Sequence, residues 1–142
     1  MKKEVFPEDI RLVHTETMLM RWGDMDAMMH VNNTVYFRYM EQARIGWIET
    51  WGVGTTAAGA EGPIIANAAC QFRRPLKYPG AVEVRVYAGQ VGRSSLPTYY
   101  EMRRTDDPAT VYATGEALFV WFSNTTGKPA VFPEAVRRRL EA

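Results

Sequence analysis

The sequence has little of the chemistry that marks several protein classes. Its 142 residues include one cysteine and two histidines. The single thiol, Cys70, excludes an internal disulfide, and a zinc site would need several further ligands. The formal net charge is +1, which gives no general attraction for nucleic acid or an anionic membrane. An anionic ligand must therefore be held by a local cluster of basic residues.

Long hydrophobic runs are also missing from the sequence. No segment approaches the roughly 18–20 apolar residues that span a bilayer, and the N-terminal stretch lacks the apolar centre of a signal peptide. Hydrophobic residues still make up 46% of the chain and charged residues 23%, which is ordinary globular composition. A chain of this length usually forms one core. We therefore expect one cytoplasmic domain over residues 1–142, with no membrane or nucleic-acid partner.

The first third of the chain has the periodicity of a strand followed by a long helix. Residues 12–21 alternate partly between apolar and polar types, as strands do, and residues 34–50 carry apolar side chains at spacings of three and four. The apolar face of that helix comprises Tyr36, Met40, Ala43 and Trp47. Asn33 is a favourable N-cap type, and Gly52 suits a helix end.

The rest of the chain is typical of strands with short connections. After a loop of small residues at 52–63, strand-like runs cover residues 64–73, 82–86, 98–104 and 111–122. Short connections between successive strands favour antiparallel pairing. Pro133 is tolerated in a first helical turn, so residues 133–142 predict a short terminal helix. The predicted fold class is α+β: a five-stranded antiparallel sheet wrapped around one long helix, with a short C-terminal helix.

An irregular polar stretch joins the first strand to the helix. Residues 22–33 read WGDMDAMMHVNN. Hydrolysis of a thioester needs a carboxylate that attacks or activates water, donors for the developing oxyanion, and a dry acyl pocket. Asp26 could supply the carboxylate. The first N–H groups of the following helix lack intrahelical partners and could supply the donors.

This stretch resembles the signature of the hydroxybenzoyl-CoA thioesterase-like hotdog proteins. The resemblance runs from Arg21 to Asn33, continues with Tyr36 and the EQAR run Glu41 to Arg44, and is close to the D-x-D-x-x-x-H-V-N-N-x-x-Y subgroup of acyl-CoA thioesterases. It implies a hotdog fold, an acyl-CoA hydrolase, and a homodimer or homotetramer whose active sites are formed between chains. It implies no metal and no cofactor, because CoA is part of the substrate.

The resemblance also implies roles for single residues. Asp26 is the catalytic carboxylate, acting as base or nucleophile, and the backbone N–H of Asn33 points at the thioester carbonyl. His30 completes the catalytic set and is expected to fix the Asp26 loop. The expected substrate-binding residues are Trp22, Tyr36, Arg73, Arg93 and Ser94. Met29 stands where the family commonly has glycine, which predicts a reshaped loop or a narrower acyl pocket.

The phosphates of CoA need Lys or Arg near the rim of the pocket. Three basic clusters are candidates: Arg73, Arg74 and Lys77 at one strand end, Arg93 and Ser94 in a turn, and Arg103 and Arg104 at another strand end. In isolation each cluster is more typical of a solvated strand end. The resemblance favours the cluster of Arg93 and Ser94.

Several alternatives stay open. Asp24 and Asp26 are also typical turn formers. Glu41 is a competing acid, because a related hotdog branch has its catalytic acid on this helix, although its arginine neighbours favour an ion pair. Cys70 is typical of a packed core thiol. The alternative functions are an acyl-carrier-protein thioesterase, a non-catalytic module that binds acyl thioesters, and a hotdog dehydratase, whose separate Asp and His motif the sequence lacks.

Overall fold

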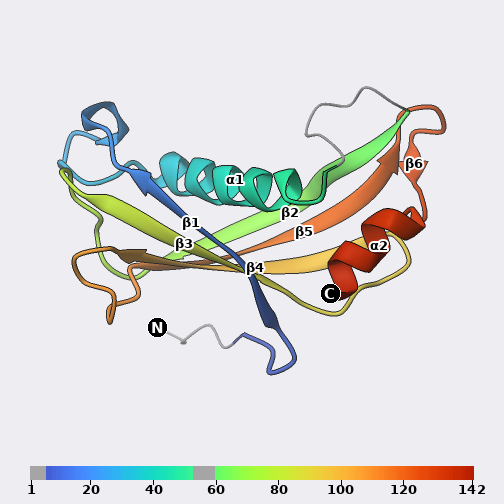
Figure 1. Cartoon of the computed structure of the whole chain (residues 1–142). Coiled ribbons are helices and arrows are strands. Elements are labelled where there is room, and N and C mark those ends of the chain that lie inside the picture. The colour runs from blue at the N-terminus through green and yellow to red at the C-terminus, as the bar shows by residue number, and fades with distance from the viewer. Residues whose placement is uncertain (1–5, 53–59) are drawn as a thin grey trace.

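A computed structural model describes residues 6–52 and 60–142, and its elements follow the predicted order (Figure 1). The strands are β1 (Arg11–Leu19), β2 (Glu61–Phe72), β3 (Ala81–Ala88), β4 (Ser95–Arg104), β5 (Ala113–Ser123) and the two-residue β6 (Lys128–Pro129). The helices are the 3₁₀ turn η1 (Trp22–Asp24), α1 (Asn33–Glu49) and α2 (Glu134–Glu141). The loop predicted at 52–63 lies largely outside the described residues. No described helix is both long and apolar enough to cross a membrane.

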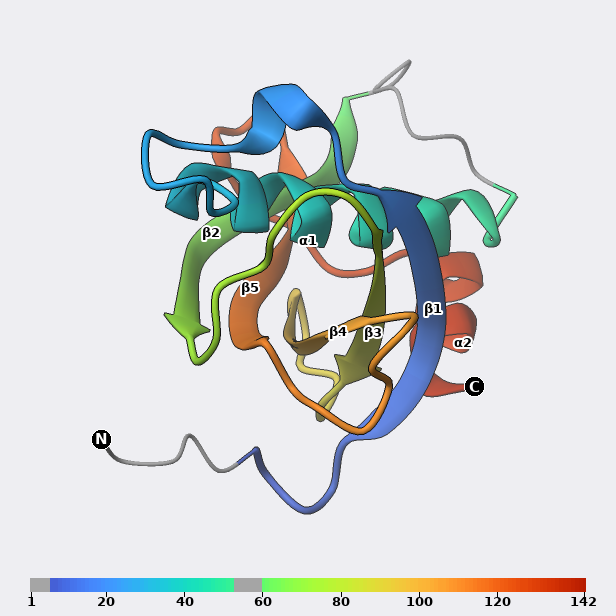
Figure 2. The ribbon, with the colours of Figure 1, turned by 90° about the vertical axis from the view of Figure 1, so that its left-hand side faces the viewer.

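The long strands form one antiparallel sheet in the order β1-β3-β4-β5-β2, and β6 pairs with the end of β5. The first two strands of the sequence are therefore the two edges of the sheet. Figure 2 shows the sheet curving between these edges, with α1 lying across one face. This arrangement confirms the predicted α+β class, in which an antiparallel sheet wraps around one long helix.

Helix α1 begins at Asn33, and its N-cap is Asn32 rather than the predicted Asn33. The Oδ1 atom of Asn32 accepts hydrogen bonds from the backbone N–H and the hydroxyl of Thr34, both at 3.0 Å. Both asparagines are suitable cap types, so the backbone decides between them. Asn32 is non-helical, with a φ of −57° and a ψ of 138°, whereas Asn33 is already helical.

Strand boundaries differ from the predicted ones by up to three residues. Strand β1 ends at Leu19 instead of Arg21, because the N–H of Arg21 donates to the side chain of Asp24 and joins the η1 turn. Strand β2 begins at Glu61, three residues earlier than predicted, through its pairing with Ser123. Such long-range pairing is not encoded in local periodicity.

The predicted apolar face of α1 packs against the sheet. Its four members are all buried, and full burial of a side chain such as Met40 contributes roughly 1.5–3 kcal/mol. They join one core with apolar residues of β3, β4 and β5. Gly115 on β5 permits a close approach of the helix, since a Cβ at this position would lie 2.7 Å from the Sδ of Met40.

The two ends of the sheet carry different elements. Figure 1 shows η1 and the first turn of α1 at one end, and α2 at the opposite end. Helix α2 is anchored by two buried side chains, Val136 and Leu140. Its Arg137 donates from Nη1 to the carbonyl of Gly92 at 3.1 Å. The turn between β3 and β4 therefore lies at the α2 end.

Strand β2 is the least covered of the five long strands. Most of its side chains are exposed, whereas alternate residues of β3 are buried. On one side β2 pairs with β5, and on the other side it has no neighbouring strand among the described residues. Ile64 and Phe72 are 42% and 43% exposed. The strand thus presents an open edge together with apolar surface.

Candidate active site

The loop between β1 and α1 forms a tight turn that is closed by Asp26. The backbone N–H of Asp26 donates to the carbonyl of His30 at 2.8 Å, and the N–H of Met29 donates to the carbonyl of Asp26 at 3.0 Å. The Oδ1 atom of Asp26 accepts from the N–H groups of Met28 at 2.9 Å and His30 at 3.3 Å. Both of these bonds go to Oδ1. The turn therefore orients the carboxylate through one of its two oxygens.

Met29 adopts a φ of +60°, in the left-handed region that favours glycine. This conformation gives a physical reason for the glycine that is common at the matching position in the resembled family. The side chain of Met29 is 55% exposed and is not among the residues that line the cavity beside Asp26. In the single chain Met29 therefore constrains the backbone of the loop and does not narrow this cavity.

Asp24 connects η1 to α1. Its Oδ2 atom accepts hydrogen bonds from the N–H of Arg21 at 2.9 Å and from the hydroxyl of Tyr39 at 2.8 Å. Its carbonyl accepts from the N–H of Asn32 at 2.8 Å. Burial, together with this carboxylate, raises the pKa of Tyr39, so the phenol stays protonated and donates. These bonds agree with the turn-forming interpretation of Asp24.

A cavity of about 300 Å³ lies where the loop meets the end of β2. Its lining consists of Asp26, His30, Val31, Asn33, Tyr36, Phe72, Arg73, Arg74 and Pro75. The three residues expected to be catalytic thus converge on it, together with Tyr36 and Arg73 from the expected substrate-binding set. Sequence reasoning missed Val31, Phe72 and Pro75. The only signal for Phe72 was its place at the end of a strand, directly before the basic cluster.

The segment from Arg73 to Gly80, which joins β2 to β3, supports this cavity through Leu76. The N–H of Leu76 donates to the hydroxyl of Tyr36 at 3.2 Å, and its carbonyl accepts from the N–H of Val31 at 2.8 Å. Burial raises the pKa of Tyr36, and the charge of Asp26 adds a smaller contribution. The phenol is therefore neutral at physiological pH. Leu76 ties the β2–β3 segment to both the motif loop and α1.

The start of α1 offers a hydrogen-bond donor to the cavity. The N–H groups of Thr34 and Val35 donate to the side chain and the carbonyl of Asn32, respectively. The N–H of Asn33 has no acceptor among the residues that the structure describes, as is usual in a first helical turn. The partial positive charge of a helix N-terminus favours developing negative charge. A carboxylate residue, Asp26, and a residue with an unbonded backbone N–H, Asn33, therefore border one cavity.

Three residues expected to bind substrate lie outside the cavity. Trp22 lies on η1 and is 70% exposed. Arg93 and Ser94 lie in the β3–β4 turn at the opposite end of the sheet, where their carbonyls accept from the N–H groups of Phe132 and Trp121 (Figure 1). Within one chain, Arg93 and Ser94 are therefore far from Asp26.

The competing acid and the thiol have other surroundings. Glu41 is exposed and forms a surface ion pair with Arg38, with 3.1 Å between Nη1 and Oε1. Arg44 turns to the core instead, where its Nη1 lies 3.3 Å from the hydroxyl of Tyr100 and its guanidinium lies over that ring. Cys70 is half-buried on β2. None of these residues lines the described cavity.

Residues 20–140 match the family model of the thioesterase-like superfamily. Among solved structures, the protein PA2801 of Pseudomonas aeruginosa, assigned as a thioesterase, is 37% identical with a TM-score of 0.85, covering 90% of this chain and 98% of its own. A protein of Xanthomonas campestris assigned as an acyl-CoA thioesterase is 30% identical with a TM-score of 0.71, covering 78% and 93%.

The fold extends to more distant relatives. A 1,4-dihydroxy-2-naphthoyl-CoA thioesterase of Synechocystis is 15% identical with a TM-score of 0.83, covering 89% of this chain and 94% of its own. A search among curated proteins gave no match. The chain belongs to the thioesterase-like superfamily, and its sheet and helix form the hotdog fold. By class, it is a thioesterase.

Proposed function

We propose that this enzyme hydrolyses acyl-CoA to a carboxylic acid and free CoA at the cavity beside Asp26. The observation that carries the proposal is the convergence of Asp26, His30 and Asn33 on one cavity. The acyl-CoA assignment of the Xanthomonas relative supports the substrate class. The motif, whose residues line this cavity, supports the same class.

The proposed reaction uses the two features that border the cavity. As a general base, the carboxylate of Asp26 accepts a proton from water, whose oxygen attacks the thioester carbonyl carbon. The N–H of Asn33 donates to the carbonyl oxygen as negative charge develops there. The carbon–sulfur bond then breaks, and the departing CoA thiolate takes the proton from Asp26. In the nucleophilic variant, the carboxylate attacks the carbon directly, and the carbon–sulfur bond breaks as CoA thiolate leaves. Water then hydrolyses the resulting mixed anhydride, which releases the carboxylic acid, restores the Asp26 carboxylate and supplies the proton that the thiolate takes.

The remaining lining residues fit the rest of such a substrate. Arg73 and Arg74 lie at the cavity, and guanidinium groups bind phosphate with good geometry. Phe72 and Tyr36 supply aromatic surface for an acyl group. The backbone of His30 orients Asp26 in this scheme. The chemistry requires no metal or redox cofactor, because a carboxylate and an amide donor suffice. A cytoplasmic location stays a prediction of the sequence.

We further propose that the active form is a homodimer or homotetramer whose sites are completed between chains. The open edge and exposed apolar side chains of β2 support this proposal, because an uncovered strand edge is a pairing surface.

The test is thiol release from a panel of acyl-CoAs by wild type and Asp26→Asn. We expect the substitution to lower kcat at least about 10²-fold without changing the melting temperature, because general-base participation is typically worth 10²–10⁴. Glu41→Gln is the control, since Glu41 is an exposed acid outside the cavity. Glu41→Gln should lower kcat far less than Asp26→Asn does.

Three outcomes would contradict the proposal. Loss of turnover in Glu41→Gln with near-wild-type rates in Asp26→Asn would move the catalytic acid to α1. Binding of acyl-CoA without thiol release would indicate the non-catalytic module. Release confined to acyl-carrier-protein thioesters would indicate the carrier-protein enzyme.

A further inference from the structure

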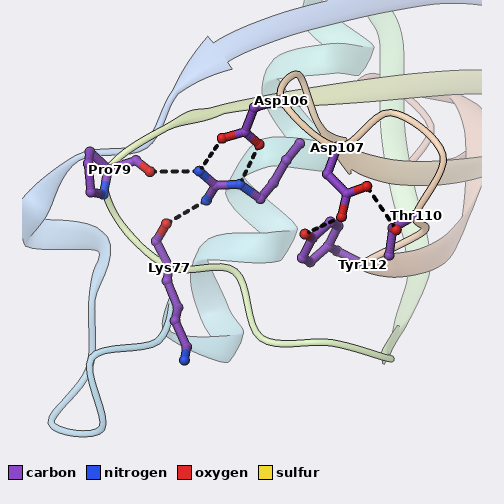
Figure 3. Close-up of polar contacts among 7 residues, drawn as sticks. Lys77, Pro79, Asp106, Asp107, Thr110 and Tyr112 are labelled. Carbon is purple, nitrogen blue, oxygen red and sulfur yellow. Dashed lines mark hydrogen bonds and ion pairs between the residues drawn. The ribbon is translucent and has the colours of Figure 1, made fainter.

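Arg104, the last residue of β4, donates hydrogen bonds to the backbone of the β2–β3 segment. It donates from Nη1 to the carbonyl of Lys77 at 2.6 Å and from Nη2 to the carbonyl of Pro79 at 2.8 Å. Asp106 completes the arrangement by accepting from Nε at 2.8 Å and from Nη2 at 3.0 Å. Figure 3 draws these bonds as dashed lines to Lys77, Pro79 and Asp106.

This arrangement differs from an ordinary surface ion pair. The side chain of Arg104 is only 16% exposed, although that of Asp106 is 66% exposed. Exposed ion pairs contribute little, but two of the acceptors of Arg104 are backbone carbonyls of the segment itself. Its donors are therefore occupied by the chain, and Arg104 is a poor candidate for the phosphate contact considered from sequence.

Gly80 allows the backbone of the β2–β3 segment to pack against the guanidinium of Arg104. Its φ is +147°, and a Cβ at this position would clash with the Nη2 of Arg104 and lie 2.8 Å from its Cζ. The carbonyl of Gly80 also accepts from the N–H of Met20 at 2.8 Å. The guanidinium thus packs directly against backbone that is bonded to the end of β1.

The β2–β3 segment, which Arg104 holds, forms one wall of the cavity. Arg73, Arg74 and Pro75 line it, and the next residue, Leu76, bonds to the Tyr36 hydroxyl and the Val31 N–H. Leu76 precedes Lys77, whose carbonyl Arg104 holds. Displacement of Lys77 would therefore be transmitted through Leu76 to Val31 and the adjoining Asp26–His30 turn.

We propose that Arg104 is a positioning residue of the thioesterase site, and this inference rests on the proposed function. It holds the β2–β3 segment so that Leu76 keeps Tyr36 and the Asp26–His30 turn in their places. Arginine suits this role because its planar fork presents several donors at fixed angles, whereas a lysine ammonium is a point charge on a flexible stem. A positioning error of about 1 Å can cost up to about 10²-fold in rate.

The experiment compares Arg104→Lys with Arg85→Lys. Arg85 on β3 pairs with Glu83 two residues away, with 2.6 Å between Nε and Oε1, and Arg104 pairs with Asp106 over the same spacing. Below the melting transition, we expect Arg104→Lys to lower kcat roughly ten-fold. The amide hydrogens of Leu76 and Val31 should exchange faster than in wild type, while those of the β3–β4 pairing stay protected. Arg85→Lys should keep the wild-type kcat and the wild-type exchange rates at Leu76 and Val31.

Gly80→Ala perturbs the same contact between the Arg104 guanidinium and the β2–β3 segment, but from the backbone side. It provides a second test if Arg104→Lys does not fold. The added Cβ should displace the guanidinium, lower kcat and speed exchange at Leu76. Because both changes break one contact, the double variant should be less impaired than the product of the single effects. Wild-type kcat and wild-type exchange in either single variant would overturn the proposal, and so would effects that simply multiply.

The failure of this inference is distinguishable from the failure of the proposed function. If wild type released no thiol from any acyl-CoA, the proposed function would fail. Hydrogen exchange would then test by itself whether Arg104 holds the β2–β3 segment in place. Faster exchange at Leu76 and Val31 in Arg104→Lys would support it, and unchanged exchange would refute it.

Discussion

Asp24 and Asp26 stand two residues apart, but their surroundings give them different tasks. Asp24 accepts from the backbone of Arg21 and the buried hydroxyl of Tyr39, so it holds two elements together. Asp26 accepts from the N–H groups of Met28 and His30 in its own turn and borders the cavity. The environment of each carboxylate decides its role, as it does in enzymes that use paired acids.

At the same scale, Met29→Gly should stabilise the protein. A non-glycine residue in the left-handed region costs roughly 1–2 kcal/mol, which a glycine would recover. Glycine also raises the conformational entropy of the unfolded chain, which offsets about 0.5–1 kcal/mol of that gain. We expect a net gain of up to about 1.5 kcal/mol in the free energy of unfolding, measured with urea. Met28→Gly is the control, because the neighbouring Met28 lacks a positive φ and should be destabilised by glycine.

The same variant checks the role of Met29 in substrate choice. Because Met29 does not line the described cavity, relative rates from short to long acyl-CoAs should be unchanged by Met29→Gly. Equal destabilisation of the two glycine variants would refute the backbone explanation. An altered acyl preference would restore the pocket role expected from sequence.

At the scale of elements, the placement of α1 depends on a close contact with β5. Gly115 faces Met40 on the helix, and a Cβ at Gly115 would also lie 3.2 Å from the carbonyl of Ala69 on β2. Three elements therefore meet at a residue without a side chain. Since Asn33 and Tyr36 lie on the same helix as Met40, this contact also helps to place the cavity residues.

Gly115→Ala should destabilise the fold by about 1–2 kcal/mol, because overpacking a tight core contact typically costs 1–3 kcal/mol. Gly62→Ala on the neighbouring strand β2 is the matched control, since a Cβ there meets nothing within 4 Å. It should be close to neutral. Urea unfolding of both variants checks the prediction. A Gly115→Ala protein as stable as the control would show that Met40 yields freely, and that the contact does not determine how closely helix and sheet approach.

At the scale of the whole molecule, the two sheet edges are not equivalent. Edge strand β1 alternates exposed and half-buried residues over α1, whereas β2 exposes most of its side chains. Ala68 on β2 is exposed although its pairing partner on β5, Ala117, is buried. The edge around Ala68 is therefore uncovered in the single chain, and it is where the proposed second copy would pair.

Ala68→Arg should shift the enzyme toward monomer, because a charge on an open strand edge opposes pairing. Sedimentation over a dilution series should detect a dimer or tetramer for wild type, with specific activity falling where monomer is present. Thr15→Arg, an exposed position on the β1 edge, is the control and should keep the wild-type assembly. A fully active monomer would refute the shared site while leaving the role of Asp26 intact.

The sequence by itself determined the features that depend on neighbouring residues. The spacing of Tyr36, Met40 and Trp47 was sufficient to predict the buried face of α1, because helical periodicity is local. Short connections were sufficient to predict antiparallel strands. The motif from Asp24 to Asn33 was sufficient to predict which loop borders the cavity.

Only the tertiary structure decided which distant segments meet. The basic clusters look alike in sequence, but the strand order β1-β3-β4-β5-β2 brings Arg73 to the cavity and leaves Arg93 at the far end. The same order places the end of β4 beside the β2–β3 segment, so Arg104 holds carbonyls 25 and 27 residues away. Residue type determines what a side chain can bond, but only the pairing of distant strands determines which partner it reaches.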